Sequence, residues 1–202
     1  MKLSSRSTTP RSVLGLALDG DRLEGFWVQR VNGSAEIRKQ LSVALSLDPL
    51  GADPQLVGRE IRQHLDRSEI RERVCCVCLP PGWELTHQVA MPQLSAEDLA
   101  SFLHLEAERA FPVSPEGLMS AISQVTQPDG TRTATLFGVP REQIHRLEAV
   151  LRAAGLRPMA FSLAVPALAP AQPDATAALT LFAGQRAVTA QVLIEAKVLE
   201  VA

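Results

Sequence analysis

The stretch from Val13 to Leu23, VLGLALDGDRL, constrains the fold more than any other part of the chain. It runs apolar to Leu18, with a single Gly15, and breaks at Asp19-Gly20-Asp21. A continuous apolar run of this length is typical of a strand covered on both faces, and Asp-Gly supplies the backbone freedom of a hairpin turn. The sequence therefore predicts a central strand with a tight turn, which is either a plain hairpin or a loop that cradles phosphate.

Composition limits the class of protein. The 202 residues allow one large or two small domains, and 46% of them are apolar, which is enough for a sizeable core. A net charge of −2, the lack of a basic run and only 4% aromatic residues argue against nucleic-acid binding. No apolar run approaches the roughly 20 residues that span a bilayer. Residues 1–12 are polar with no signal-peptide core behind them, so we expect a disordered tail and a cytoplasmic protein.

All three cysteines lie in one short segment, VCCVCLP. An odd number in a single strand cannot form a disulfide framework. Cys76 and Cys78 point to one face of a strand and Cys75 to the other, and no second Cys or His pair has a ligand spacing. We therefore interpret the segment as a core strand, not a metal site.

The first half of the chain reads as three strands, a helix and a fourth strand. Residues 23–31 and 35–45 follow the opening strand, with Asn32-Gly33 as a hairpin turn and Ile37, Leu41 and Val43 expected to point inward. Asp53 and Pro54 are typical of a helix start, and the helix extends to about residue 67. A helical crossover before the buried strand 74–79 indicates that this strand pairs in parallel with the meander.

The second half alternates strands with two further helices. Ser95, with Asp98 three residues later, is the expected N-cap of a helix that ends near Ala110. A second helix extends from Arg141 to Ala154 and stops at Gly155. An Ala- and Pro-rich stretch begins at 166. The expected strands are residues 85–91, 118–126, 131–139, 158–165, 177–182 and 188–194, with 198–201 as a further piece.

No catalytic constellation stands out. The chain lacks G-x-S-x-G, G-x-x-x-x-G-K-[ST] and G-x-G-x-x-G motifs. Its histidines lie on different elements, and His104 with Glu108 is best explained as an ordinary surface pair on one helix. We predict that the chain is not an enzyme.

The order of strand, strand, strand, helix, strand resembles the first lobe of the actin-like, ribonuclease-H-like fold. The segment PPGWELTHQVAMPQLSAEDLASFLHLEAERAFPVSPEGL further resembles the PilM family of type IV pilus assembly proteins, relatives of FtsA. Its Met91-Pro92, Glu106-Ala107-Glu108 and Phe111-Pro112-Val113-Ser114-Pro115 match family elements, and residues 137–169 are similar to the family's return to the first lobe. The cytoplasmic domain of the type II secretion protein GspL is a neighbouring possibility.

This resemblance implies an α/β fold in several parts. The first lobe would comprise residues 13–80 and 131–168, with a small α+β inserted subdomain at 81–130. Residues 169–202 would be a linker and the truncated, incomplete start of a second lobe. The chain would then be either a fragment or a shortened relative that has lost nucleotide binding.

The resemblance also implies a partner. In the family, the inserted subdomain and the adjacent first lobe take a short peptide from the inner-membrane protein PilN. An apolar helix face beside a stiff proline turn gives a rigid groove that an extended peptide can fill. The expected partner-binding residues are Leu99, Phe102, Leu103, Phe111 and Pro112, although most of these are equally explained as packing of the subdomain.

The nucleotide loops depart from the family pattern. Ala17 takes the place of an acidic residue, and Asp19 that of a glycine, in a loop that resembles G-I-D-I-G-S-S-S in relatives. The second loop reads Phe182-Ala183-Gly184 where relatives have D-I-G. Negative charge at Asp19 and Asp21 repels phosphate unless a metal intervenes. We therefore predict a non-catalytic component of a pilus or type II secretion platform, with no cofactor.

Two alternatives stay open. The first is an actin-like ATP-binding protein or ATPase of the same machinery that holds Mg-ATP at Asp19, Gly20 and Asp21. The second is a small sugar-kinase-like enzyme, for which the sequence offers no general base with a sugar-binding neighbourhood.

Overall fold

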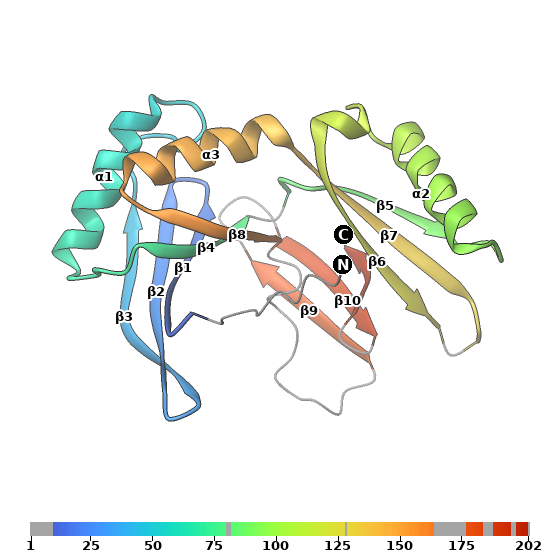
Figure 1. The fold of residues 1–202 in the computed structure, drawn as a ribbon, viewed down its shortest axis with the longest axis horizontal. Coiled ribbons are helices and arrows are strands. Elements are labelled where there is room, and N and C mark those ends of the chain that lie inside the picture. Colours follow the sequence, from blue (N-terminus) through green and yellow to red (C-terminus); the bar gives the residue numbers. More distant parts are fainter. Residues whose placement is uncertain are drawn as a thin grey trace, which may run out of the picture.

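The computed structural model describes residues 10–79, 82–127, 129–163, 177–183, 188–194 and 197–201. Three sheets are formed, and Figure 1 shows helices α1 and α3 over the first of them and α2 beside the second. The predicted α/β class is confirmed. The predicted tail falls mostly outside the described residues, although Ser12 already begins the first strand. The predicted linker at 169–176 also lies outside them.

The first sheet has the predicted meander and parallel crossover. Its strand order is β3-β2-β1-β4-β8; the β1–β2 and β2–β3 pairs are antiparallel, and the β1–β4 and β4–β8 pairs are parallel. The Gly20-Asp21 turn closes a hairpin that is paired up to Asp19 and Arg22. The strands are β1 (Ser12–Asp19), β2 (Arg22–Val31), β3 (Ser34–Ala44), β4 (Val74–Leu79) and β8 (Arg157–Leu163).

Helices α1 (Pro54–Arg67) and α3 (Arg141–Ala153) cover one face of this sheet. The predicted cap of α1 is confirmed, because the Asp53 carboxylate accepts a hydrogen bond from the Gln55 amide at 2.7 Å. The two helices meet at Gly58, where an added Cβ would lie 2.5 Å from the Cβ of Ala153. This close approach excludes any larger side chain at position 58 without a shift of the helices.

The face of the first sheet that α1 and α3 cover is more deeply buried than the opposite face. Leu14, Leu16 and Leu18 are at most 4% exposed, whereas Gly15 and Ala17 between them are half-buried. The apolar run predicted a central strand buried on both faces, but only one face of β1 is fully buried and the other is half-buried. Cys75 on β4 is also buried, and burial raises the pKa of its thiol to about 12. Both observations fit the core-strand interpretation.

One inward residue was predicted wrongly. Leu41 is buried and Val43 half-buried, but Ile37 is 63% exposed. The pairing of β2 with β3 shifts register between Trp27 and Val28, which is the signature of a bulge. Because a one-residue shift exchanges the two faces of a strand, simple alternation fails beyond it.

The second sheet has the order β5-β7-β6 and is antiparallel throughout. It consists of β5 (Leu85–Ala90), β6 (Leu118–Thr126) and β7 (Arg132–Pro140), and α2 (Ala96–Ala110) packs on it. Ser95 caps α2 as predicted, since its hydroxyl accepts from the Asp98 amide at 3.1 Å. The sequence analysis grouped 131–139 with residues 13–80, whereas β7 pairs with β5 and β6 in the second sheet. The division into lobes stays a prediction.

A third sheet, β11-β10-β9, contains the three strands expected near the end of the chain. They are β9 (Ala177–Ala183), β10 (Val188–Ile194) and β11 (Lys197–Val201), and β11 lies against β6 and β7. Helix α3 connects the other two sheets directly, because Pro140 ends β7 and Arg141 begins α3. The junction between the first and second sheets is therefore formed by α3 and by the β4–β5 connection.

Candidate functional site

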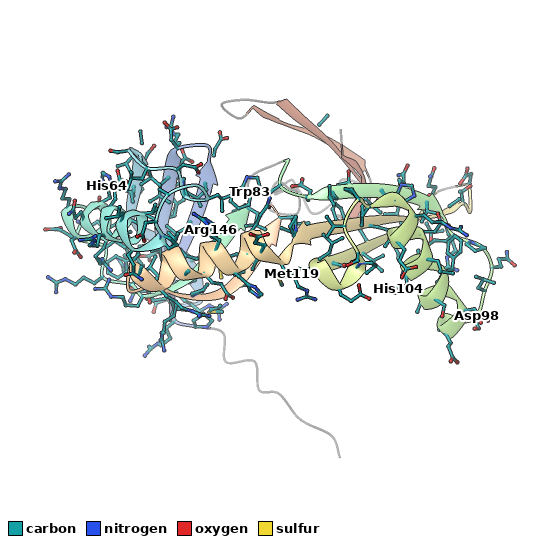
Figure 2. All side chains as sticks on the ribbon, turned by 90° about the horizontal axis from the view of Figure 1, so that it is seen from above. His64, Trp83, Asp98, His104, Met119 and Arg146 are labelled. Atoms are coloured by element: carbon teal, nitrogen blue, oxygen red, sulfur yellow. The ribbon has the colours of Figure 1, made fainter. Side chains whose placement is uncertain are left out.

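A pocket of about 400 Å³ lies beside the hairpin turn that the sequence singled out. Its wall comes from three segments that are distant in sequence: the turn at Gly20-Asp21, the β3–α1 loop from Leu45 to Leu50, and Trp83. The carboxyl ends of the parallel strands β1 and β4 lead into the first and last of these segments. Ligands of open α/β sheets bind at this end of the strands. Figure 2 shows Trp83 in the middle of the molecule, far from His104 and Asp98 on α2.

The loop that lines the pocket is fastened at both ends. The Glu60 carboxylate of α1 accepts a hydrogen bond from the Ser46 amide at 2.6 Å, and the Arg146 guanidinium of α3 donates to the Ala52 carbonyl at 2.8 Å. Within the loop, the Asp48 carboxylate accepts from the Leu50 amide at 2.9 Å. These contacts hold the pocket wall in place, so the site is preformed.

The lining combines apolar and acidic side chains. Asp21 and Asp48 are its ionisable residues, and neither Lys nor Arg is among the described lining residues. Glu84 follows Trp83, and burial raises the pKa of its carboxyl group although nearby backbone amides act against that shift. The pKa of the Cys78 thiol is also raised, by burial first and then by the nearby Glu84. The described pocket thus offers a negatively charged end and no cation.

Of the residues predicted for a phosphate loop, two line the pocket and one does not. Gly20 and Asp21 line the pocket, and Gly20 has a φ of 61°, the left-handed conformation that glycine adopts without strain. Asp19 is half-buried at the end of β1 and does not line the pocket. With Asp21 and Asp48 facing the cavity and no basic side chain opposite, the described lining does not fit a nucleotide's phosphates.

The predicted partner-binding residues are divided between core and surface. Leu103 and Phe111 are 4% and 7% exposed and fill the core of the second sheet with Met91, Leu118, Ala134 and Leu136. Leu99 and Phe102 are half-buried against that core, and Pro112 is exposed. Peptide binding by these residues stays a prediction, and only Pro112 lies fully on the surface.

Sequence reasoning missed Trp83 and the loop from Leu45 to Leu50. The loop was read as a connector, because nothing local marks it as a pocket wall. Trp83 directly follows Pro80-Pro81-Gly82 and is one of two tryptophans in the chain, which is the one signal that could have drawn attention to it.

Outside the pocket, the predicted histidine–glutamate pair on α2 is formed, and the described residues hold no candidate metal site. His104 and Glu108 are 3.4 Å apart on the surface of α2, which confirms the predicted pair. No group of three or more metal-ligating side chains occurs among the residues that the structure describes. Nor, over the same residues, is any helix both long and apolar enough to cross a bilayer.

No family model matches the sequence, and no curated protein matches it. Several solved structures share its fold, and two of them are informative here. A chain of the PilM–PilN type IV pilus biogenesis complex has a TM-score of 0.74 and 20% identity over 96% of this chain. The cytoplasmic domain of EpsL, an inner membrane component of the type II secretion system of Vibrio cholerae, has a TM-score of 0.58 and 16% identity over 91% of this chain.

The match covers 61% of the PilM–PilN chain and 71% of the EpsL domain. At these identities the likeness establishes the fold. It confirms that the chain shares the fold of a chain of the PilM–PilN complex and of the EpsL cytoplasmic domain, as the sequence resemblance implied.

Proposed function

We propose that this chain is a non-catalytic, cytoplasmic component of a type IV pilus or type II secretion platform at the inner membrane. Its role is to bind a short cytoplasmic peptide of a PilN-like membrane protein. The fold shared with a chain of the PilM–PilN complex supports the class of machine. The fold shared with the cytoplasmic domain of an inner membrane component supports the location.

The observation that carries the proposal is the pocket at Trp83. Its apolar wall of leucines, proline and tryptophan suits the side chains of an extended peptide, and its two aspartates suit a basic residue in the same peptide. The pocket lies between the loops at the carboxyl edge of the first sheet and Trp83, which stands in the connection to the second sheet. Pro112, with Leu99 and Phe102, is the alternative contact surface.

The same lining argues against nucleotide as the ligand. A nucleoside triphosphate carries several negative charges, and the described pocket places Asp21 and Asp48 where compensating cations would be needed. We therefore infer that nucleotide binding has been lost. The ATP-binding alternative requires a metal ion that bridges these carboxylates to phosphate.

Calorimetry with a synthetic peptide tests the proposal. The peptide is the cytoplasmic N-terminal segment of a PilN-like protein encoded in the same genome. Trp83→Ala and the double variant Asp21→Asn/Asp48→Asn should each weaken binding about tenfold or more, because an anchor aromatic or a charged contact contributes at least 1.4 kcal/mol. Asp48→Asn keeps the oxygen that accepts from the Leu50 amide, so the loop is preserved.

Pro112→Ser is the matched surface control and should bind as tightly as the unaltered chain. Loss of binding in Pro112→Ser together with retention in the pocket variants would place the peptide on α2's side instead. Absence of binding to the unaltered chain, with thermal stabilisation by Mg-ATP, would refute the adaptor role, since a ligand that binds only the native state raises its stability.

A further inference from the structure

Six exposed arginines gather at one edge of the first sheet, here called the amino edge: Arg11, Arg30, Arg67, Arg71, Arg73 and Arg157. Strands β1, β4 and β8 begin at this edge, and β2 ends there. The backbone ties the positions together, because the Arg157 amide donates to the Arg73 carbonyl at 2.7 Å and the Arg30 amide to the Arg11 carbonyl at 2.8 Å. The fold thus brings arginines that are far apart in sequence to one edge of the sheet.

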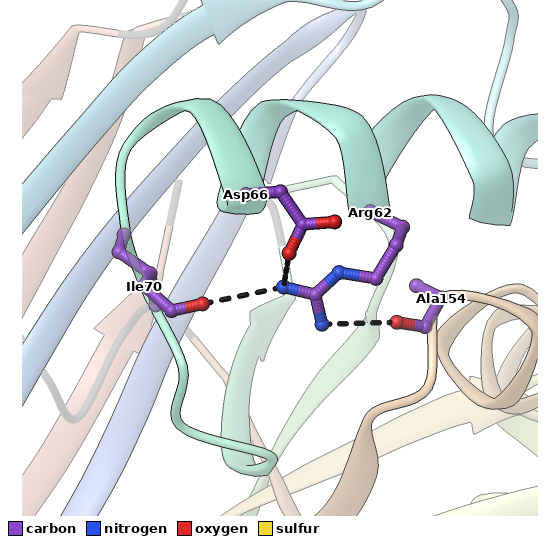
Figure 3. A network of polar contacts seen from close by, with 4 residues as sticks. All are labelled: Arg62, Asp66, Ile70 and Ala154. Carbon is purple, nitrogen blue, oxygen red and sulfur yellow. Dashed lines mark hydrogen bonds and ion pairs between the residues drawn. The ribbon is translucent and has the colours of Figure 1, made fainter.

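A seventh arginine, Arg62, holds the two loops that carry this edge. Figure 3 shows its guanidinium between α1 and the end of α3. It donates to the Ile70 carbonyl at 3.2 Å and to the Ala154 carbonyl at 3.4 Å, and it pairs with Asp66 at 2.8 Å. Ile70 precedes Arg71 and Arg73, and Ala154 precedes Arg157, so the exposed arginines project from a fixed frame.

Carboxylates offset only part of the positive charge of the amino edge. Glu69 lies close enough to Arg71, and Glu72 close enough to Arg157, for an electrostatic interaction. The short ion pairs of the nearby carboxylates are made with other residues: Asp66 with Arg62, and Glu69 with Lys39 at 2.7 Å. The Glu72 carboxylate accepts from the Arg73 and Val74 amides at 2.8 and 2.9 Å. The dipole of α1 accounts for a basic residue at Arg67, but not for those at the strand ends.

We propose that the amino edge lies against an anionic phospholipid surface. The guanidinium groups spread over four strand ends, a width of about 14 Å at normal strand spacing, and so match a field of lipid phosphates rather than one bound ion. Among the residues that the structure describes, Met159 and Ile37 are the large exposed apolar side chains on strands that begin at this edge. Protein interfaces have an apolar core, which this surface lacks. Basic residues near an anionic leaflet each contribute about 1 kcal/mol of attraction.

Co-sedimentation with lipid vesicles tests this surface. The full chain is mixed with vesicles of phosphatidylglycerol and phosphatidylethanolamine, or of neutral phosphatidylcholine, at low and physiological salt. The triple variant Arg71→Gln/Arg73→Gln/Arg157→Gln should lower partitioning to the anionic vesicles on the order of 100-fold. The matched variant Arg22→Gln/Arg109→Gln/Arg132→Gln removes the same charge elsewhere and should change it by less than about fivefold, since distant charges are screened.

A lysine variant separates charge from shape. Arg71→Lys/Arg73→Lys/Arg157→Lys keeps the charge but loses the planar, two-pronged donor, so it should still bind the vesicles. Equal binding to neutral and anionic vesicles, equal loss in both triple glutamine variants, or tighter binding to a short DNA duplex would each overturn the proposal. The pocket and the amino edge lie at opposite edges of the first sheet, so the lipid proposal does not depend on the peptide pocket. Asp21→Asn should therefore leave vesicle binding intact.

Discussion

The two edges of the first sheet carry opposite charge on the same scaffold. At the carboxyl edge, the pocket presents Asp21 and Asp48 beside Trp83. At the amino edge, six exposed arginines outnumber the nearby carboxylates Asp66, Glu69 and Glu72. Both edges are fastened by an arginine that donates to backbone carbonyls, Arg146 at the pocket and Arg62 opposite. Half-buried arginines here secure the loops, whereas the exposed charges near them are available to partners.

Removing Arg62 should have the largest effect on stability. Arg62→Met deletes two hydrogen bonds to carbonyls and one ion pair, which should cost about 2 kcal/mol of unfolding free energy. Urea denaturation measures it. Arg59→Met is the control: Arg59 is exposed on the same helix and makes one long bond to the Gln55 carbonyl, so its loss should stay below about 0.5 kcal/mol. Equal losses would show that the Figure 3 contacts contribute nothing specific.

Removing Arg146 should lower the unfolding free energy by less than removing Arg62, and should loosen the loop that lines the pocket. Arg146→Met deletes one hydrogen bond to the Ala52 carbonyl, worth about 1.5 kcal/mol for a charged donor. Hydrogen exchange should accelerate in the loop at 45–52 while the amino-edge loop at 68–73 stays protected, because Arg62 still holds the latter. Uniform acceleration in both loops would contradict separate fastening. Arg152→Met, which removes only an exposed pair with Glu148, is the neutral comparison.

The smallest expected effect is on the pH dependence of stability, to which Glu84 and Glu72 contribute with opposite sign. Burial raises the pKa of Glu84 in the folded chain, so the charged form is disfavoured and its contribution to stability is lost as pH rises through that value. Burial also acts to raise the pKa of Glu72, but hydrogen bonds from Ser12, Val74 and Arg73 outweigh it and the net shift is downward. The contribution of Glu72 is therefore present above the unfolded pKa and lost in acid.

Glu84→Gln should then stabilise the chain at neutral pH, and Glu72→Gln should destabilise it there. Both differences should shrink as the pH falls below the ordinary glutamate value near 4.5. Urea midpoints for each variant across this range provide the measurement. A change of the same sign for both variants at neutral pH would mean that the two environments do not differ as described.

Local signals predicted the frame of the molecule well. Asp53 and Ser95 cap the helices that they were expected to cap, and the crossover after α1 gives the expected parallel pair of β1 and β4. A cap depends on a few neighbouring residues, so sequence suffices. Ile37 was wrong because a bulge is not visible in a hydrophobic pattern. The assignment of β7 also differed, because strand partners are set by the fold and not by the strand itself.

Both candidate surfaces were beyond local reasoning. The pocket unites Asp21, Asp48 and Trp83, and the amino edge unites Arg11, Arg73 and Arg157, each from three separate segments. Only the topology of the first sheet brings them together. For the predicted partner residues Leu103 and Phe111, the sequence suggested a binding surface where the structure has a core. Their apolar spacing is equally typical of a core, and both side chains are buried.

The central claim is that the pocket at the first turn binds peptide and not nucleotide. Amide chemical shifts of the isotopically labelled chain test it most directly, with the PilN-like peptide and Mg-ATP added to separate samples. The peptide should shift the amide signals of Gly20, Asp21, the loop at 45–50 and Trp83, and Mg-ATP should leave these signals in place. Shifts of Gly20 and Asp21 by Mg-ATP, with no response to the peptide, would contradict it.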